Sequence, residues 1–263
     1  MCKVLLLYTF DIFYAAHDFG HTEKLFIFRR IFIMTIYGFQ KMTLLDYPGK
    51  VACTLFTGGC NFRCPFCHNA MLVTELDREN YYTDEEIFDY LKKRVGILDG
   101  VCITGGEPLM NDDIDDFIRR IRELGYSVKL DTNGSYPEKL KKLIDDGLVD
   151  YVAMDIKNTP EKYAETIGVK KFDFTPVKRS IDLLMSGSVP YEFRTTVVNE
   201  FHTVQDIEEI AKMIAGAQGY FLQNFVDSGS LIGADLSAVS KDNLEKMRET
   251  AAQYVVNTGV RGV

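Results

Sequence analysis

From residue 51 onward, short apolar runs alternate with segments whose apolar residues recur at helical spacing. Strands that are apolar throughout, rather than at every second position, are typical of a parallel sheet covered by helices. Helix-capping signals agree, because Thr83-Asp84-Glu85-Glu86 fits a capping box and Gly125 and Gly147 follow two predicted helices. The pattern therefore predicts an α/β chain of six strand–helix units that form a partial TIM-like barrel rather than a closed one. The predicted strands are 51–57, 101–104, 127–131, 151–156, 191–198 and 220–223, and the predicted helices are 83–95, 112–124, 137–146, 176–185, 203–215 and 240–255.

Polar motifs follow the ends of these predicted strands. In folds of parallel strands the carboxyl ends meet at one face, and the loops that follow them carry the chemistry. We therefore expect a single shared site. The converging motifs are the cysteine cluster at 60–67, residues 105–107, residues 131–133, Asp155 with Lys157, and Arg194 within the fifth strand.

The cysteine cluster is the strongest chemical signal in the chain. Cys60, Cys64 and Cys67 have the spacing C-x3-C-x2-C. Three thiolates from one loop can hold three irons of a four-iron cluster, and because no fourth cysteine lies nearby, one iron would keep an open position for a substrate. A zinc knuckle is the alternative, but structural zinc usually needs a second pair of ligands, and here only His68 is adjacent.

The other cysteines and the charge narrow the class of protein. Cys53 and Cys102 lie inside predicted strands, where a free cysteine behaves as a small hydrophobe. Clustered cysteines in a chain of this length indicate a metal site in a reducing compartment, so we expect a cytoplasmic protein. The net charge of −8, without a strong basic cluster, argues against a nucleic-acid partner, and no apolar run is long enough to predict a membrane span.

The first 33 residues differ from the rest of the chain. They are rich in aromatic residues and isoleucine, but their apolar residues recur with no regular period. They also lack the uninterrupted apolar run and the small-residue cleavage site of a signal peptide. We expect 1–33 to be a disordered extension or the product of a misassigned start codon, with the orderly pattern beginning at Met34. A targeting or anchoring segment is the alternative.

Two motifs resemble those of the radical S-adenosylmethionine (SAM) enzymes. The cysteine spacing, with the aromatic Phe66 before the last cysteine, is similar to the hallmark of that superfamily. Gly105-Gly106-Glu107 matches its glycine–glycine–glutamate motif. The resemblance runs from residue 34 to the last helix and implies a single radical SAM domain over 34–263, with a partial (β/α)6 barrel of the radical SAM type.

The resemblance is closer to the glycyl-radical enzyme activating family. The sequences Cys67-His68-Asn69 and Asp155-Ile156-Lys157 look like stretches of pyruvate formate-lyase activating enzyme. Residues 38–40 and 44–50 are similar to a segment of anaerobic ribonucleoside-triphosphate reductase activating proteins.

The resemblance implies a [4Fe-4S] cluster on the three cysteines and SAM chelating the open iron. Gly106, which has no side chain, would let the backbone approach the methionine moiety, and Glu107 would accept from its ammonium group. Lys157 or Arg194 could pair with its carboxylate, and the resemblance favours Lys157. The residues expected to bind the cofactors are Phe66 and His68 near adenine, with Gly105, Gly106, Glu107, Asp131, Asp155, Lys157 and Arg194, while Lys157 and the three cysteines are expected to be catalytic. Plainer alternatives are a simple turn for 105–108, surface salt bridges for the two cations and loop packing for Phe66.

Asp131 and Asp155 are predicted to end neighbouring strands. Two close carboxylates repel each other unless a cation or a proton lies between them. The resemblance implies a monovalent cation here, beside Thr132, and an acid–base pair is the alternative. Gln223 departs from the resemblance, because pyruvate formate-lyase activating enzyme has a histidine near adenine at that place. His202, beside a predicted helix start, is expected to be a solvated loop residue.

The implied reaction is reductive cleavage of SAM, followed by hydrogen abstraction from a glycine of a partner enzyme by the 5′-deoxyadenosyl radical. The implied partner is an anaerobic ribonucleotide reductase, with a flavodoxin- or ferredoxin-type electron donor. The alternative among enzymes is a radical SAM enzyme that acts on a small molecule, similar to a 7-deazapurine synthase. The alternatives that are not enzymes are an iron–sulfur electron carrier and a zinc-binding module. Residues 71–82 are the only cover for the site that we expect from the sequence.

Overall fold

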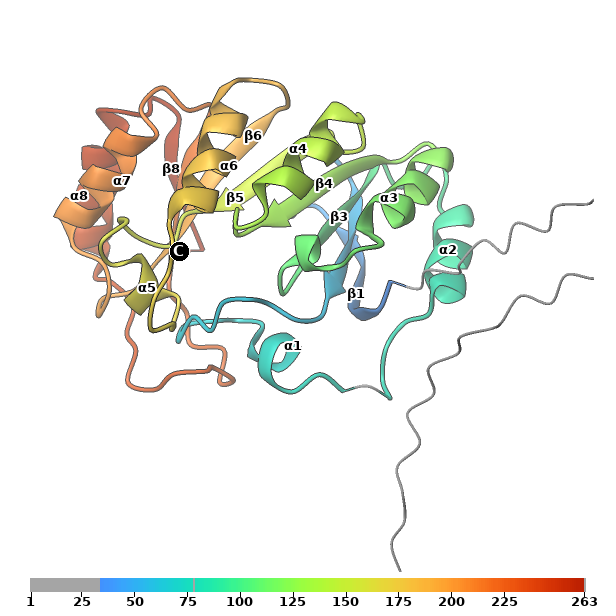
Figure 1. Ribbon diagram of the computed structural model, residues 1–263, viewed down its shortest axis with the longest axis horizontal. Helices are drawn as coiled ribbons and strands as arrows, with labels where there is room; N and C mark the ends of the chain where they lie inside the picture. The colour runs from blue at the N-terminus through green and yellow to red at the C-terminus, as the bar shows by residue number, and fades with distance from the viewer. Residues whose placement is uncertain (1–33, 78, 263) are drawn as a thin grey trace, which may run out of the picture. The chain divides into compact units, whose positions relative to one another are not determined.

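The computed structural model describes residues 34–77 and 79–262, which form one curved sheet with helices along its outer side (Figure 1). The sheet has eight strands in chain order, from β1 to β8. β1 is antiparallel to β2, and all later neighbours are parallel. The strands are β1 (Ile36–Thr43), β2 (Ala52–Thr57), β3 (Gly100–Gly105), β4 (Ser127–Thr132), β5 (Tyr151–Asp155), β6 (Tyr191–Val197), β7 (Tyr220–Asn224) and β8 (Thr258–Arg261).

Helices connect the parallel strands in the order expected of a partial barrel. The capping box predicted at Thr83 is present, because its side chain accepts from the backbone of Glu86 and the Glu86 carboxylate accepts from the Thr83 backbone. The helices are α1 (Ala70–Thr74), α2 (Asp84–Lys92), α3 (Ile114–Glu123), α4 (Pro137–Asp145), α5 (Tyr163–Thr166), α6 (Thr175–Met185), α7 (Val204–Met213) and α8 (Lys241–Ala252), with a 3-10 turn, η1 (Pro108–Met110).

The predicted fold class is confirmed, with two additional edge strands. The six predicted strands correspond to β2 through β7, and the sheet is not closed because its edge strands β1 and β8 do not pair with each other. The hydrophobic pattern did not reveal β1, which exposes three consecutive residues, or β8, which has four residues and none fully buried.

The core lies between the sheet and the apolar faces of the helices. In α3, for example, Ile114, Phe117, Ile118 and Ile121 recur at helical spacing and are all buried. Cys53 and Cys102 have no exposed surface, so they are buried in strands as expected.

The segment before β2 closes the end of the barrel that lies opposite the strand carboxyl ends. Tyr47 is 2% exposed, and its ring approaches both Tyr151 and the backbone at Gly100, where an added Cβ would lie 2.9 Å from the ring. The hydroxyl of Thr54 donates to the Asp46 carboxylate over 2.6 Å. Within the 44–50 segment, Tyr47 is therefore the side chain that fills the amino-terminal end of the barrel.

No helix within 34–77 or 79–262 combines the length and the apolar character needed to cross a bilayer.

The expectation for residues 1–33 lies outside the described residues and stays a prediction. A chain that starts at Met34 should unfold within about 2 °C of the full chain, because it keeps β1, which begins at Ile36, and the described core, which includes Met34. Thermal unfolding measures this. A chain that starts at Val51 is the contrasting control, since it lacks β1 and Tyr47 and should unfold at a clearly lower temperature. Equal loss of stability in both chains would mean that 1–33 belongs to the domain.

Candidate active site

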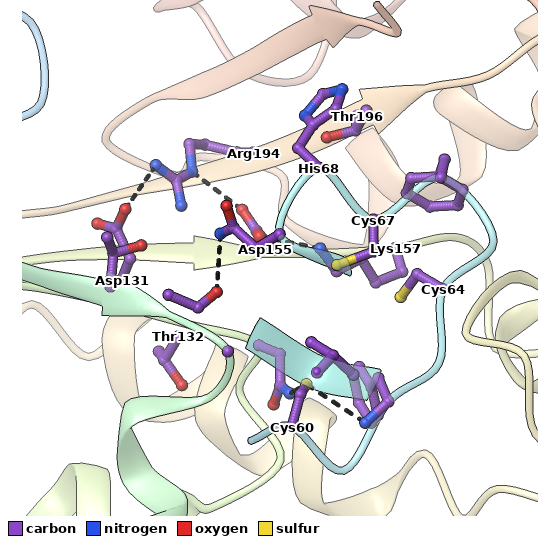
Figure 2. Close-up of a pocket in the computed structure, with 18 of the residues that line it drawn as sticks. Cys60, Cys64, Cys67, His68, Asp131, Thr132, Asp155, Lys157, Arg194 and Thr196 are labelled. Carbon is purple, nitrogen blue, oxygen red and sulfur yellow. Dashed lines mark hydrogen bonds and ion pairs between the residues drawn. The ribbon is translucent and has the colours of Figure 1, made fainter. Parts of the chain in front are cut away.

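The carboxyl ends of β3 to β7 and the loop after β2 surround one cavity (Figure 2). Eleven residues that the sequence marks as candidates line it: Cys60, Cys64, Phe66, Cys67, His68, Gly105, Gly106, Asp131, Asp155, Lys157 and Arg194. Thr132 and Gln223 line it as well. Glu107 is the one candidate that does not.

The cysteine loop (residues 60–68) is held by its own backbone and by the segment after α5. The backbone N–H of Arg63 donates to the Ile167 carbonyl over 2.8 Å, and the N–H of Cys67 donates to the Cys64 carbonyl over 3.1 Å. Burial raises the pKa of the Cys60 thiol to about 11 and that of the Cys64 thiol to about 12. The thiols of Cys60 and Cys64 are therefore protonated near neutral pH when they hold no ligand.

The two glycines of the 105–107 motif are required by contact with the loop after β2. Gly105 has φ +115°, and a Cβ there would lie 2.4 Å from the Thr57 backbone. A Cβ on Gly106 would lie 1.9 Å from the carbonyl oxygen of Gly59. Only glycine allows this approach. The motif consequently positions the backbone directly before Cys60.

Glu107 lies behind the cavity wall. Its side chain has no exposed surface, and it accepts from the Leu109 N–H (3.1 Å), the Thr132 hydroxyl (2.8 Å) and the Asn133 N–H (2.7 Å). Burial raises the pKa of this carboxyl to about 7, and the three donors oppose that effect. In this structure Glu107 ties the end of β3 to the end of β4.

A set of half-buried ion pairs joins the ends of β4, β5 and β6 (Figure 2). The Arg194 guanidinium contacts Asp155 through Nε (2.9 Å) and Asp131 through Nη1 (3.2 Å). The Lys157 ammonium contacts Asp155 (2.9 Å), and the buried Lys129 contacts Asp131 from below the cavity. The predicted surface-salt-bridge alternative does not describe these groups, since they line the barrel interior.

Arg194 lies where the sequence predicted a cation or a proton. Burial alone would raise the pKa of Asp131 and Asp155, but the adjacent Arg194 guanidinium holds the pKa of both carboxyls below the usual range. Both are therefore ionised, and neither is poised to donate a proton near neutral pH. The positive charge between them is a side chain, so the geometry gives no support to a monovalent cation.

The connection between β7 and α8, residues 225–239, reaches the cysteine loop. The His68 ring lies parallel to the Phe225 ring, and its Nε2 lies 2.8 Å from the Val226 carbonyl. The N–H of Gly233 donates to the Pro65 carbonyl over 2.8 Å. The expectation that only 71–82 could cover the site was therefore incomplete. Gly229 and Gly233, in a long stretch without periodicity, were the signal for this connection.

His202 is buried, so the prediction of a solvated loop residue was wrong. It is 4% exposed, accepts from the Val198 N–H at Nδ1 (3.1 Å) and bonds the Lys157 carbonyl through Nε2 (2.7 Å). Its ring also lies 6.4 Å from that of Phe66, which is itself buried. His202 therefore supports both Lys157 and the cysteine loop.

Comparison with known proteins identifies the family. Residues 54–214 match the model of the radical SAM superfamily. The chain belongs to that superfamily. A Methanocaldococcus jannaschii protein whose name assigns it as a glycyl-radical enzyme activating enzyme is 34% identical over 236 residues, covering 86% of this chain and 95% of that protein. A GTP 3′,8-cyclase of Alkaliphilus oremlandii is 31% identical over 163 residues, covering 59% of this chain and 49% of that protein. The structure of Streptococcus suis SuiB bound to SAM superposes with a TM-score of 0.63 at 16% identity, over 78% of this chain and 48% of that one, and so shares the fold.

This radical SAM enzyme has a cavity that fits the cofactors implied by its family, a [4Fe-4S] cluster and SAM. Three thiols of one loop line it, and a four-iron cluster takes one thiolate on each of three irons. The three thiols therefore match the ligand set that such a cluster needs.

The burial of His202 predicts a pH dependence of stability. Burial lowers the pKa of this imidazole below its usual 6.5, so the fold favours the neutral ring. Its contribution is present above about pH 6.5 and is lost as the pH falls toward the lower pKa of the folded state, by at most about 1.4 kcal/mol per pH unit. In His202→Gln the free energy of unfolding should fall less steeply between pH 7 and 5. Urea unfolding across this range measures it, with His68→Gln as the control for loss of an imidazole. Equal slopes in wild type and His202→Gln would contradict the assignment.

Proposed function

We propose that the chain activates a glycyl-radical enzyme by abstracting hydrogen from a glycine of that partner. The observation that carries this proposal is the similarity to the Methanocaldococcus jannaschii protein, which extends over 95% of that protein's length and reaches 34% identity. By the resemblance of residues 38–40 and 44–50, the partner is an anaerobic ribonucleotide reductase. A flavodoxin- or ferredoxin-type protein would supply the electron, and we place the reaction in the cytoplasm.

The cysteine loop would hold the cluster and the strand ends would hold SAM. When bound, the cluster would supply the electron that cleaves SAM and starts the hydrogen abstraction. Lys157 directs one contact to Asp155 and, because an ammonium has three donors, retains N–H groups for the methionine carboxylate. The backbone at Gly105 and Gly106 would pass beside the methionine moiety. Phe66 and the His68 backbone would lie toward adenine, with the 225–239 connection near them.

Glu107 would support this arrangement rather than bind SAM directly. Its two oxygens are occupied by three protein donors, including the N–H of Asn133. Binding the SAM ammonium through this carboxylate would require Glu107 to leave those donors unpaired in a buried place, which costs about 1–3 kcal/mol for each.

The charges of the cavity favour a polypeptide substrate over a phosphorylated one. Among the described residues, two basic side chains line the cavity, Lys157 and Arg194. Both form ion pairs with carboxylates. A nucleotide would bring phosphate charges to a wall whose two cations already pair with carboxylates, whereas the backbone of a glycine carries no net charge. Glycine also has no side chain to clash with the residues that line the cavity.

The cysteine assignments can be tested one residue at a time. Cys60→Ala, Cys64→Ala and Cys67→Ala should each lose the cluster and all SAM cleavage under anaerobic, reducing conditions. Cys53→Ala and Cys102→Ala should keep both, with a loss of unfolding free energy of about 1 kcal/mol. Iron content and 5′-deoxyadenosine production measure this. If Cys53 or Cys102 proved necessary for iron, the three-ligand site would be wrong.

The partner is tested by mixing the reduced enzyme, SAM and an anaerobic ribonucleotide reductase, then recording the electron paramagnetic resonance spectrum. A glycyl doublet that disappears with Cys64→Ala is the expected result. Absence of the doublet with this and other glycyl-radical enzymes, together with turnover of a free nucleotide-like compound, would favour the small-molecule alternative. Failure to bind SAM at all would favour an electron carrier or a zinc module.

A further inference from the structure

Asn133, the first residue after β4, directs its side-chain amide at the cysteine loop. It is 6% exposed and lines the cavity. Its Nδ2 lies 3.7 Å from the Sγ of Cys60 and donates to the Asn61 side-chain oxygen over 2.9 Å. Both amide hydrogens are thus directed at the loop that carries the first cysteine.

The orientation of this amide is fixed by its other contacts. The Asn133 side-chain oxygen accepts from the backbone N–H of Ser135 (2.9 Å) and from the Ser135 hydroxyl (2.5 Å). A backbone N–H can only donate, so the atom facing Ser135 must be the oxygen and the atom facing Cys60 must be the nitrogen. The Asn61 amide in turn donates to the Ser135 hydroxyl over 2.9 Å, which closes a ring of three side chains.

The backbone of Asn133 is held as firmly as its side chain. Its N–H donates to the fully buried Glu107 carboxylate over 2.7 Å. Glu107 therefore acts on the cysteine loop through Asn133, and the end of β4 cannot shift without breaking a buried hydrogen bond.

Cys60 differs from the other two cysteines in this respect. Its sulfur is approached by two N–H donors, the backbone of Phe62 at 3.3 Å and the Asn133 side chain. Across residues 34–77 and 79–262, the sulfurs of Cys64 and Cys67 receive no such hydrogen bond. The polar environment of the three thiols is therefore asymmetric.

We propose that Asn133 is a positioning residue that raises the reduction potential of the cluster through its N–H···S contact with Cys60. This rests on the proposed cluster. When one electron from the external donor enters the cluster, negative charge on the sulfur ligands increases. A fixed N–H donor stabilises the reduced state more than the oxidised state, and hydrogen bonds to the sulfurs are among the factors that set cluster potentials.

The test is a redox titration of the reconstituted full chain without SAM. The electron paramagnetic resonance signal of the reduced cluster reports the fraction of reduced protein at each potential. Asn133→Ala should lower the equilibrium constant for one-electron reduction about tenfold, which is a fall of about 59 mV in midpoint potential. Asn69→Ala is the matched control. Asn69 also lines the cavity, but its Nδ2 donates to the Gly105 carbonyl over 2.9 Å and not to a thiol, so the potential should stay unchanged.

A purely structural role of Asn133 would leave the potential unmoved. Full iron content with an unchanged midpoint potential in Asn133→Ala overturns the proposal, as does an equal shift in Asn69→Ala. If Asn133→Ala does not retain iron, Asn133→Ser is titrated instead, since it keeps a polar group for Ser135 but is too short to reach the sulfur. Loss of iron from both variants assigns Asn133 to cluster assembly and also overturns the proposal. A wild-type chain that binds no cluster is a different result and refutes the proposed function.

Discussion

Arg194 makes a charged barrel interior possible. Two ionised carboxylates this close inside the barrel would repel each other without a cation between them. By contacting Asp131 and Asp155 together, the guanidinium keeps both carboxyls ionised and joins three adjacent strands at their carboxyl ends. Lys157 is held in position by its own contact with the Asp155 carboxylate. Lys129 and Lys157 each contact one of the two carboxylates, and Arg194 is the cation that bridges both.

A second constraint is the close backbone contact between the loops after β2 and β3. The N–H of Gly106 donates to the Thr57 carbonyl, and the N–H of Glu107 donates to the Gly59 carbonyl. Because Gly59 directly precedes Cys60, the glycine motif fixes where the cysteine loop begins. The cysteine loop and the 105–107 motif are therefore one structural unit, although they are far apart in the sequence. Glycine is required at positions 105 and 106 by the packing of the protein itself.

Much of the fold was predictable from local patterns, since buried parallel strands and amphipathic helices each leave a clear hydrophobic signature. The edge strands β1 and β8 left none, because an edge strand buries few side chains and does not need an apolar run. His202 was misplaced for a related reason. The residues next to it in the chain do not indicate its burial, which is decided by contacts with Val198 and Lys157.

The sequence by itself determined the cysteine spacing, the glycine motif and the order of strand and helix, because each depends on residues close together in the chain. Tertiary structure alone decided how the charges pair, that Glu107 faces away from the cavity, and that Asn133 reaches Cys60. The contacts of Arg194 with Asp131 and Asp155, of Glu107 with Thr132 and of Asn133 with Cys60 join residues between 25 and 73 positions apart. Side-chain direction at the end of a strand depends on sheet register and twist, which no local pattern specifies.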